Sequence, residues 1–131
     1  MIPILDRRTV PGFWPWSDKG GVAHVQPPAA ILERMVAFRL HLDDCPAESG
    51  PLRVIPGSHR LGILSDEGIA RARETMAEQT ITAEKGDGLL MRPLLLHASS
   101  AVAGPAEHRR VLHIEWAVDD LPGGLEWHSR V

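Results

Sequence analysis

Residues 35–43, MVAFRLHLD, alternate between two faces and decide the fold class of this chain. One face carries the larger apolar side chains, Val36, Phe38, Leu40 and Leu42. The other face is mostly polar and carries Ala37, Arg39, His41 and Asp43. Strict alternation over this length is typical of a β-strand, because successive side chains of a strand point to opposite sides. We therefore expect a strand that begins near Met35.

The segments around this strand are short and separated by turn residues. A turn over 44–51 is followed by a predicted strand over 52–55, which Pro56-Gly57 ends. Further strands or strand pieces are predicted over Thr80–Glu84, Leu89–Met91, Leu94–Ala98 and Arg109–Val118. Ala29–Met35 suits one or two helical turns. Ser65–Gln79 is predicted to be a surface helix, with Ser65 as its N-cap and acidic residues in its first turn.

Composition limits the class of protein. The chain has 131 residues, 44% of them hydrophobic and 24% charged, which suits one globular domain. A net charge of −3 argues against a nucleic-acid partner, and no apolar run is long enough to span a membrane. The N-terminus lacks the layout of a signal peptide, and a single cysteine, Cys45, fits a reducing cytoplasm.

Roughly six short strands and one long helix predict a mainly β fold, a double-stranded β-helix of the jelly-roll or cupin-like type with one inserted surface helix. A complete jelly roll needs about eight strands, so we expect the fold to be incomplete at its N-terminal side. Residues 1–28 are rich in proline and glycine and predict an irregular flap. We treat residues 1–131 as a single partial domain.

His97 and Arg109 are the main candidate functional residues of the chain. His97 ends the apolar run that starts at Leu89, and Arg109 opens the last predicted strand. Imidazole is a good ligand for a ferrous ion, and a guanidinium binds a carboxylate with two parallel hydrogen bonds. Arg110 would point to the opposite face of a regular strand, so only one of the two arginines can serve.

Several segments together resemble the phytanoyl-CoA dioxygenase family. They are Leu40–Asp44, the stretch Ser49–Arg60 that contains Pro56-Gly57-Ser58-His59, then Gly86-Asp87, His97–Ser100 and His108–Arg110. These segments follow one another in the order that the family shows, and the similarity covers most of the chain from about Val10 onward.

The resemblance implies a double-stranded β-helix that binds Fe(II) and the co-substrate 2-oxoglutarate and hydroxylates a small organic substrate. It assigns His97 to the metal and Arg109 to the far carboxylate of 2-oxoglutarate. From its place on the polar strand face beside His41, Arg39 is a candidate to line the co-substrate pocket; the alternative is a solvated guanidinium. The family's early His-x-Asp motif is expected upstream of Met1, so the chain is expected to be the C-terminal part of the domain. Whether the isolated chain is an active enzyme therefore stays open, and we expect weak or absent turnover.

Two other segments of the chain have a pattern similar to the early His-x-Asp motif. His41-Leu42-Asp43 lies on the first predicted strand, and His113-Ile114-Glu115 lies on the last one. His41 and Asp43 are the less favoured substitutes as metal ligands, since the resemblance places their strand elsewhere; the alternative is a polar face that lines the pocket. His113 and Glu115 are favoured still less as metal ligands.

Two other functions remain open at this stage. One is a non-catalytic, cupin-like module that binds a small molecule. The other is a truncated remnant that forms a homodimer through an open sheet edge, because unpaired strands recruit partners. The element Pro56-Gly57-Ser58-His59 is interpreted as structural under each of these functions.

Overall fold

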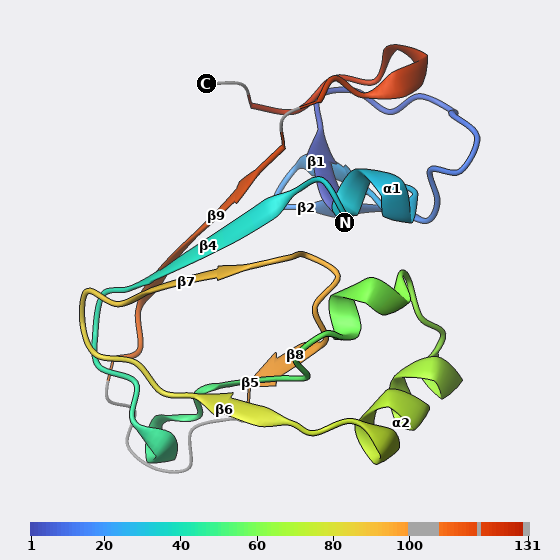
Figure 1. The fold of residues 1–131 in the computed structure, drawn as a ribbon. Coiled ribbons are helices and arrows are strands. Elements are labelled where there is room, and N and C mark those ends of the chain that lie inside the picture. The colour runs from blue at the N-terminus through green and yellow to red at the C-terminus, as the bar shows by residue number, and fades with distance from the viewer. Residues whose placement is uncertain (100–107, 118, 130–131) are drawn as a thin grey trace. The chain divides into compact units, whose positions relative to one another are not determined.

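The chain forms two compact units in the computed structural model, which describes residues 1–99, 108–117 and 119–129. One unit is formed by Met1–Arg34 with Ala117–Val131, and the other by Met35–Trp116. The described strands form three antiparallel sheets of three strands each (Figure 1). The mainly β class predicted from the alternating sequence, with its cupin-like sheets, is therefore confirmed. In the described part of the chain, no helix has the length and apolar character needed to cross a bilayer.

The first unit contains a sheet with the strand order β1-β3-β2. Its elements are β1 (Ile2–Ile4), β2 (Trp16–Lys19), β3 (Val22–Val25), helix α1 (Ala29–Leu32) and a 3-10 turn (Pro122–Gly124). Ile2, Ile4 and Val25 are fully buried and form the centre of this unit.

These strands differ from the irregular flap that we expected over residues 1–28. Gly20 and Gly21 have φ values of 61° and 81°, and they join β2 to β3 as a two-residue hairpin. A tight hairpin needs positive φ at both central residues, which glycine adopts at low cost. The glycines that we interpreted as signs of irregular structure thus form the turn of a hairpin.

The second unit contains two sheets, with strand orders β7-β4-β9 and β6-β5-β8. Its strands are β4 (Val36–His41), β5 (Leu52–Val54), β6 (Gln79–Ile81), β7 (Gly88–Met91), β8 (His97–Ser99) and β9 (Val111–Trp116). Its helical elements are 3-10 turns at Ala47–Ser49 and Ser58–Leu61, and helix α2 at Asp66–Thr75. Figure 1 shows α2 at one end of the β6-β5-β8 sheet.

The core of the second unit lies between its two sheets. Ala37 and Met91 from one sheet pack with Leu52 and Val54 from the other, and all four are buried. Burial of apolar side chains at about 25 cal/mol per Å² is the main force that holds two such sheets together. The inner face of each sheet is therefore the face that carries these residues.

The predicted elements of the second unit are present, but several of their boundaries differ. The predicted helix ends at Thr75, and Gln79 belongs to β6. The last strand begins at Val111, after Arg109 and Arg110. Ser65 caps α2, because its side-chain oxygen accepts a hydrogen bond from the Gly68 amide at 3.2 Å. The strand predicted over Leu94–Ala98 is wrong in its first half. There the Leu95 amide donates to the Arg92 carbonyl at 3.0 Å and closes a turn, and β8 begins only at His97.

Candidate functional site

The polar face of β4 points between the two sheets of the second unit. Ala37 and His41 are 1% and 3% exposed, and Arg39 lies between them on the same face. In register, Arg39 pairs with Leu89 on β7 and with His113 on β9. The polar face of β4 is thus the inner face of its sheet, which it shares with the buried Ala37.

His97 begins β8 and lies in register with Val54 of β5. Paired residues of neighbouring strands share a face, so His97 lies on the inner face of its sheet with the buried Val54. The His97 Nδ1 atom is 2.8 Å from the Leu95 carbonyl oxygen. A carbonyl can only accept, so Nδ1 carries the proton and Nε2 keeps its lone pair, as in metal-binding histidines. The exposed His97 also borders a cavity of about 260 Å³ that Ile69 of α2 helps to line.

Ser58, from the Pro-Gly-Ser-His element, holds the backbone just before His97. Ser58 is fully buried, and its Oγ accepts a hydrogen bond from the Leu96 amide at 2.9 Å. The Leu96 carbonyl in turn accepts from the Ile55 amide at 3.0 Å. Both hydrogen-bonding groups of Leu96 are thus fixed by the segment that follows β5. Sequence reasoning interpreted the element as structural but missed that it positions His97.

We expect Ser58→Ala to lower the free energy of unfolding by about 1–3 kcal/mol, because it leaves the half-buried Leu96 amide without its acceptor. Urea unfolding followed by circular dichroism would measure the change. Ser17→Ala is the control, since the Ser17 hydroxyl makes an exposed contact with Met1 in the first unit. Equal stability of the Ser58→Ala variant and the parent chain would show that Ser58 does not carry this role.

Arg109 and Arg110 lie just before β9 and have different partners. Arg110 donates to both carboxylate oxygens of Asp43, with Nη2–Oδ1 and Nε–Oδ2 distances of 2.8 and 2.9 Å, and its amide also donates to Oδ2 at 2.8 Å. These bonds hold the pKa of Asp43 well below its usual range. Arg109 instead donates through Nη1 to the carbonyl of Gly50, just before β5.

The less favoured ligand pair His41 and Asp43 is not brought together. The ring of His41 is buried on the inner face of β4, whereas Asp43 lies beyond the end of β4 with its carboxylate on Arg110. In the other segment with this pattern, His113-Ile114-Glu115, the two ionisable side chains contact each other. His113 Nε2 is 3.5 Å from Glu115 Oε1, and both side chains are more than a third exposed.

Arg39, His41 and Arg109 form a cluster of positive or potentially positive groups. The pKa of Arg39 is lowered by burial and by the charge of Arg109. The pKa of His41 is lowered by burial, by Arg39 and by Arg109, although Asp87 acts in the opposite direction. His41 is therefore neutral at pH 7. Asp87 is engaged in its own turn, where its Oδ2 accepts from the Glu84 amide at 2.8 Å, as expected for a turn aspartate.

A complete ferrous site is not formed by the described residues. Among residues 1–99, 108–117 and 119–129, no group of three or more His, Cys, Asp and Glu side chains could hold a metal ion. His97 is a single histidine, whereas ferrous sites of this class need two histidines and a carboxylate. Arg39 and Arg109, in contrast, fit a carboxylate ligand, because neither guanidinium forms an ion pair with a carboxylate of the described residues.

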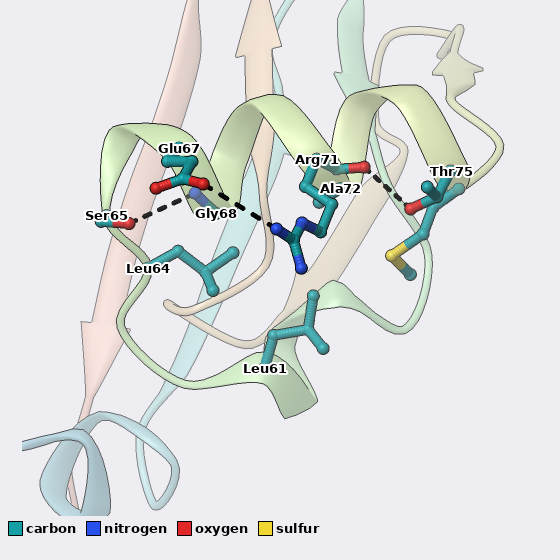
Figure 2. Close-up of a pocket in the computed structure, with 9 residues that line it drawn as sticks. Leu61, Leu64, Ser65, Glu67, Gly68, Arg71, Ala72 and Thr75 are labelled. Atoms are coloured by element: carbon teal, nitrogen blue, oxygen red, sulfur yellow. Dashed lines mark hydrogen bonds and ion pairs between the residues drawn. The ribbon is translucent and has the colours of Figure 1, made fainter.

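Two other cavities are not lined by Arg39, His41 or Arg109. One, of about 470 Å³, lies beside α2 and is lined by Leu61, Leu64 and the inner side of the helix. Figure 2 shows that its polar contacts stay within the helix: Glu67 pairs with Arg71 at 3.8 Å, and the Thr75 hydroxyl donates to the Arg71 carbonyl at 2.8 Å. None of the predicted site residues lines this cavity.

The second cavity, of about 420 Å³, is lined mainly by apolar side chains of β4, β5 and β7. Its lining includes Val36, Val54 and Met91, together with His59 and Arg92. Val54 is the residue that pairs with His97, so this cavity borders the strand position of the predicted metal ligand.

Comparison with known proteins gives one family match. A family model described as phytanoyl-CoA dioxygenase (PhyH) matches residues 8–111. Among curated proteins, no relative matches the sequence. Among solved structures, the chain is similar to the non-heme alpha ketoglutarate dependent epimerase SnoN from nogalamycin biosynthesis, with 23% identity and a TM-score of 0.47. That match covers 74% of this chain and 44% of SnoN, so the chain spans less than half the length of that structure.

Proposed function

Because this chain belongs to the phytanoyl-CoA dioxygenase family of Fe(II)/2-oxoglutarate oxygenases, we propose that it provides the co-substrate site and one iron ligand of such an enzyme. The reaction proposed for the complete enzyme is the hydroxylation of a small organic substrate. Arg109 binds the far carboxylate of 2-oxoglutarate, with Arg39 beside it, and Nε2 of His97 is the metal-binding atom. The apolar cavity next to Val54 takes the apolar part of the substrate.

One observation carries this proposal: neither Arg39 nor Arg109 forms an ion pair with a described carboxylate, and the Nε of Arg39 is buried without a hydrogen-bond partner among the described residues. Two uncompensated guanidiniums at the inner face form a binding site for an anion. His97 lies on the inner face of the opposite sheet, so a keto acid held by its far carboxylate can present its other end toward the imidazole. Iron, when bound, would supply the oxygen chemistry; the residues described here bind and orient the co-substrate.

The test measures whether a divalent metal tightens binding of the keto acid. We expect Mn(II) to strengthen 2-oxoglutarate binding to the 131-residue chain several-fold in isothermal titration calorimetry, because a keto acid chelates a metal that a histidine also holds. His97→Ala should remove this gain and leave the metal-free affinity unchanged. With Fe(II) and ascorbate, succinate formation should be weak or absent, since the described residues hold no complete ligand set.

His24→Ala is the matched control. The His24 Nδ1 atom is 2.9 Å from the Val22 carbonyl, which is the same local arrangement that His97 has with Leu95. Loss of the metal effect in both variants, or its survival in His97→Ala, would refute the assignment of His97. Binding that no metal changes would instead support the alternative of a non-catalytic binding module.

A further inference from the structure

His41 has a ring nitrogen that is buried and without a partner. The side chain is 3% exposed, and no described residue makes a hydrogen bond to its Nδ1. The backbone on either side of the ring is fixed, since the His41 amide donates to the Asp87 carbonyl at 2.9 Å and its carbonyl accepts from the Gly86 amide at 2.8 Å. A buried polar atom without a partner costs about 1–3 kcal/mol, so such an atom indicates a group that is bound there.

Arg39 repeats the same pattern two positions earlier on the same strand face. Its Nε is inaccessible to solvent and likewise has no hydrogen-bond partner among the described residues. No described carboxylate forms an ion pair with Arg39 or Arg109, and the charge of Arg109 lowers the pKa of Arg39. Both guanidiniums are half-buried, and two like charges that are partly removed from water repel each other unless an anion lies between them. One kind of ligand would satisfy both the two N–H groups without partners and the excess positive charge. It is an anion with several acceptor positions.

We propose that Arg39 Nε–H and His41 Nδ1–H donate to the far carboxylate of 2-oxoglutarate together with Arg109, so that three side chains bind this group. A carboxylate offers about four acceptor positions, which is enough for all three donors. His41 takes part as a neutral donor, and it is a binding residue rather than a metal ligand. The inference rests on the proposed function for the identity of the anion, but the donors themselves recognise only the carboxylate.

The experiment uses glutarate, which has the same carbon skeleton and far carboxylate as 2-oxoglutarate but no keto group to chelate a metal. Metal-free binding of glutarate to the 131-residue chain would be measured by calorimetry. We expect His41→Leu to raise the Kd about tenfold, because one hydrogen bond to a charged group is lost. His41→Asn should restore most of the affinity, since its side-chain amide places an N–H donor near the position of Nδ1. Arg39→Met should raise the Kd at least about tenfold.

Arg53→Met is the matched control for Arg39→Met. Arg53 on β5 also has an Nε without a partner, but it pairs with Glu78 at 3.1 Å and shares a face with Thr80 and Ala98, away from the inner face. Its substitution should leave glutarate binding unchanged. Thermal unfolding of each variant would show that it is folded.

The outcomes separate this inference from the proposed function. Glutarate binding that His41→Leu and Arg39→Met leave unchanged would overturn the inference, as would the absence of glutarate binding, while a metal-dependent gain with 2-oxoglutarate would still support the oxygenase. Glutarate binding that requires Arg39 and His41, without any effect of Mn(II) on 2-oxoglutarate, would support the three-donor site and count against the oxygenase.

Discussion

Arg109→Ala should weaken 2-oxoglutarate binding about a hundredfold, whereas Arg110→Ala should change it by less than about twofold. The two arginines are neighbours in sequence and differ in the face on which they lie. Arg109 reaches the Gly50 carbonyl near the start of β5 and has no carboxylate partner among the described residues. Arg110 is already paired with Asp43. Loss of Arg109 removes a guanidinium that binds a carboxylate, so the change is expected in ligand affinity rather than in stability.

The measurement is a titration of both variants with 2-oxoglutarate in the presence of Mn(II), together with a thermal melt of each. Arg110→Ala breaks the ion pair that lowers the pKa of Asp43, so it is the variant that should lose some stability at neutral pH. If Arg110→Ala abolished binding and Arg109→Ala did not, the assignment of the carboxylate to Arg109 would be refuted.

The faces of the strands could be predicted from sequence because a strand has a period of two residues. Alternation separates Arg109 from Arg110, and it groups Arg39 with His41, without any knowledge of the fold. The position of α2 was predictable for a similar reason, since the side chain of Ser65 caps its first turn. These features depend on local rules that hold in every fold.

Which face of β4 lies inside could not be derived from hydrophobicity alone. The larger apolar residues, such as Phe38, lie on the outer face, where the Phe38 ring is 6.2 Å from the Trp116 ring and Leu90 is 67% exposed. The polar face with Arg39 and His41 lies inside. A strand is usually oriented with its apolar face inward, and the reverse orientation here follows from the core that Ala37 forms with the opposite sheet.

Other features were missed because they depend on distant pairing. Pro3 lies within β1, where it pairs in register with His24, and a proline at an edge strand needs no ladder hydrogen bond on its outer side. The role of Ser58 depends on a hydrogen bond to Leu96, 38 residues away in sequence. Local sequence does not identify the partner of such a contact. The Pro-Gly-Ser-His element therefore predicts a turn, but not the hydrogen bond that Ser58 accepts from Leu96.

Ala37→Asp should prevent cooperative folding of the second unit, and this is the largest loss of stability that we expect from one substitution. Ala37 is 1% exposed and packs with Leu52 and Val54 of the opposite sheet and with Met91 of its own. A carboxylate at this position would have no described cation to pair with in that cluster. An unpaired buried charge costs about 3–5 kcal/mol, a large part of the 5–15 kcal/mol that stabilises a typical domain.

Leu90→Asp is the control, because Leu90 pairs with Phe38 and lies on the outer face of the same sheet. It is 67% exposed, so an added carboxylate there stays hydrated and should change the stability by less than about 1 kcal/mol. Urea unfolding followed by tryptophan fluorescence and circular dichroism would compare the two variants. If Leu90→Asp unfolded the protein while Ala37→Asp stayed native, the apolar face would be the inner one. Arg39 and His41 would then face solvent, where hydrated side chains form no buried site for a carboxylate, so both proposals depend on this result.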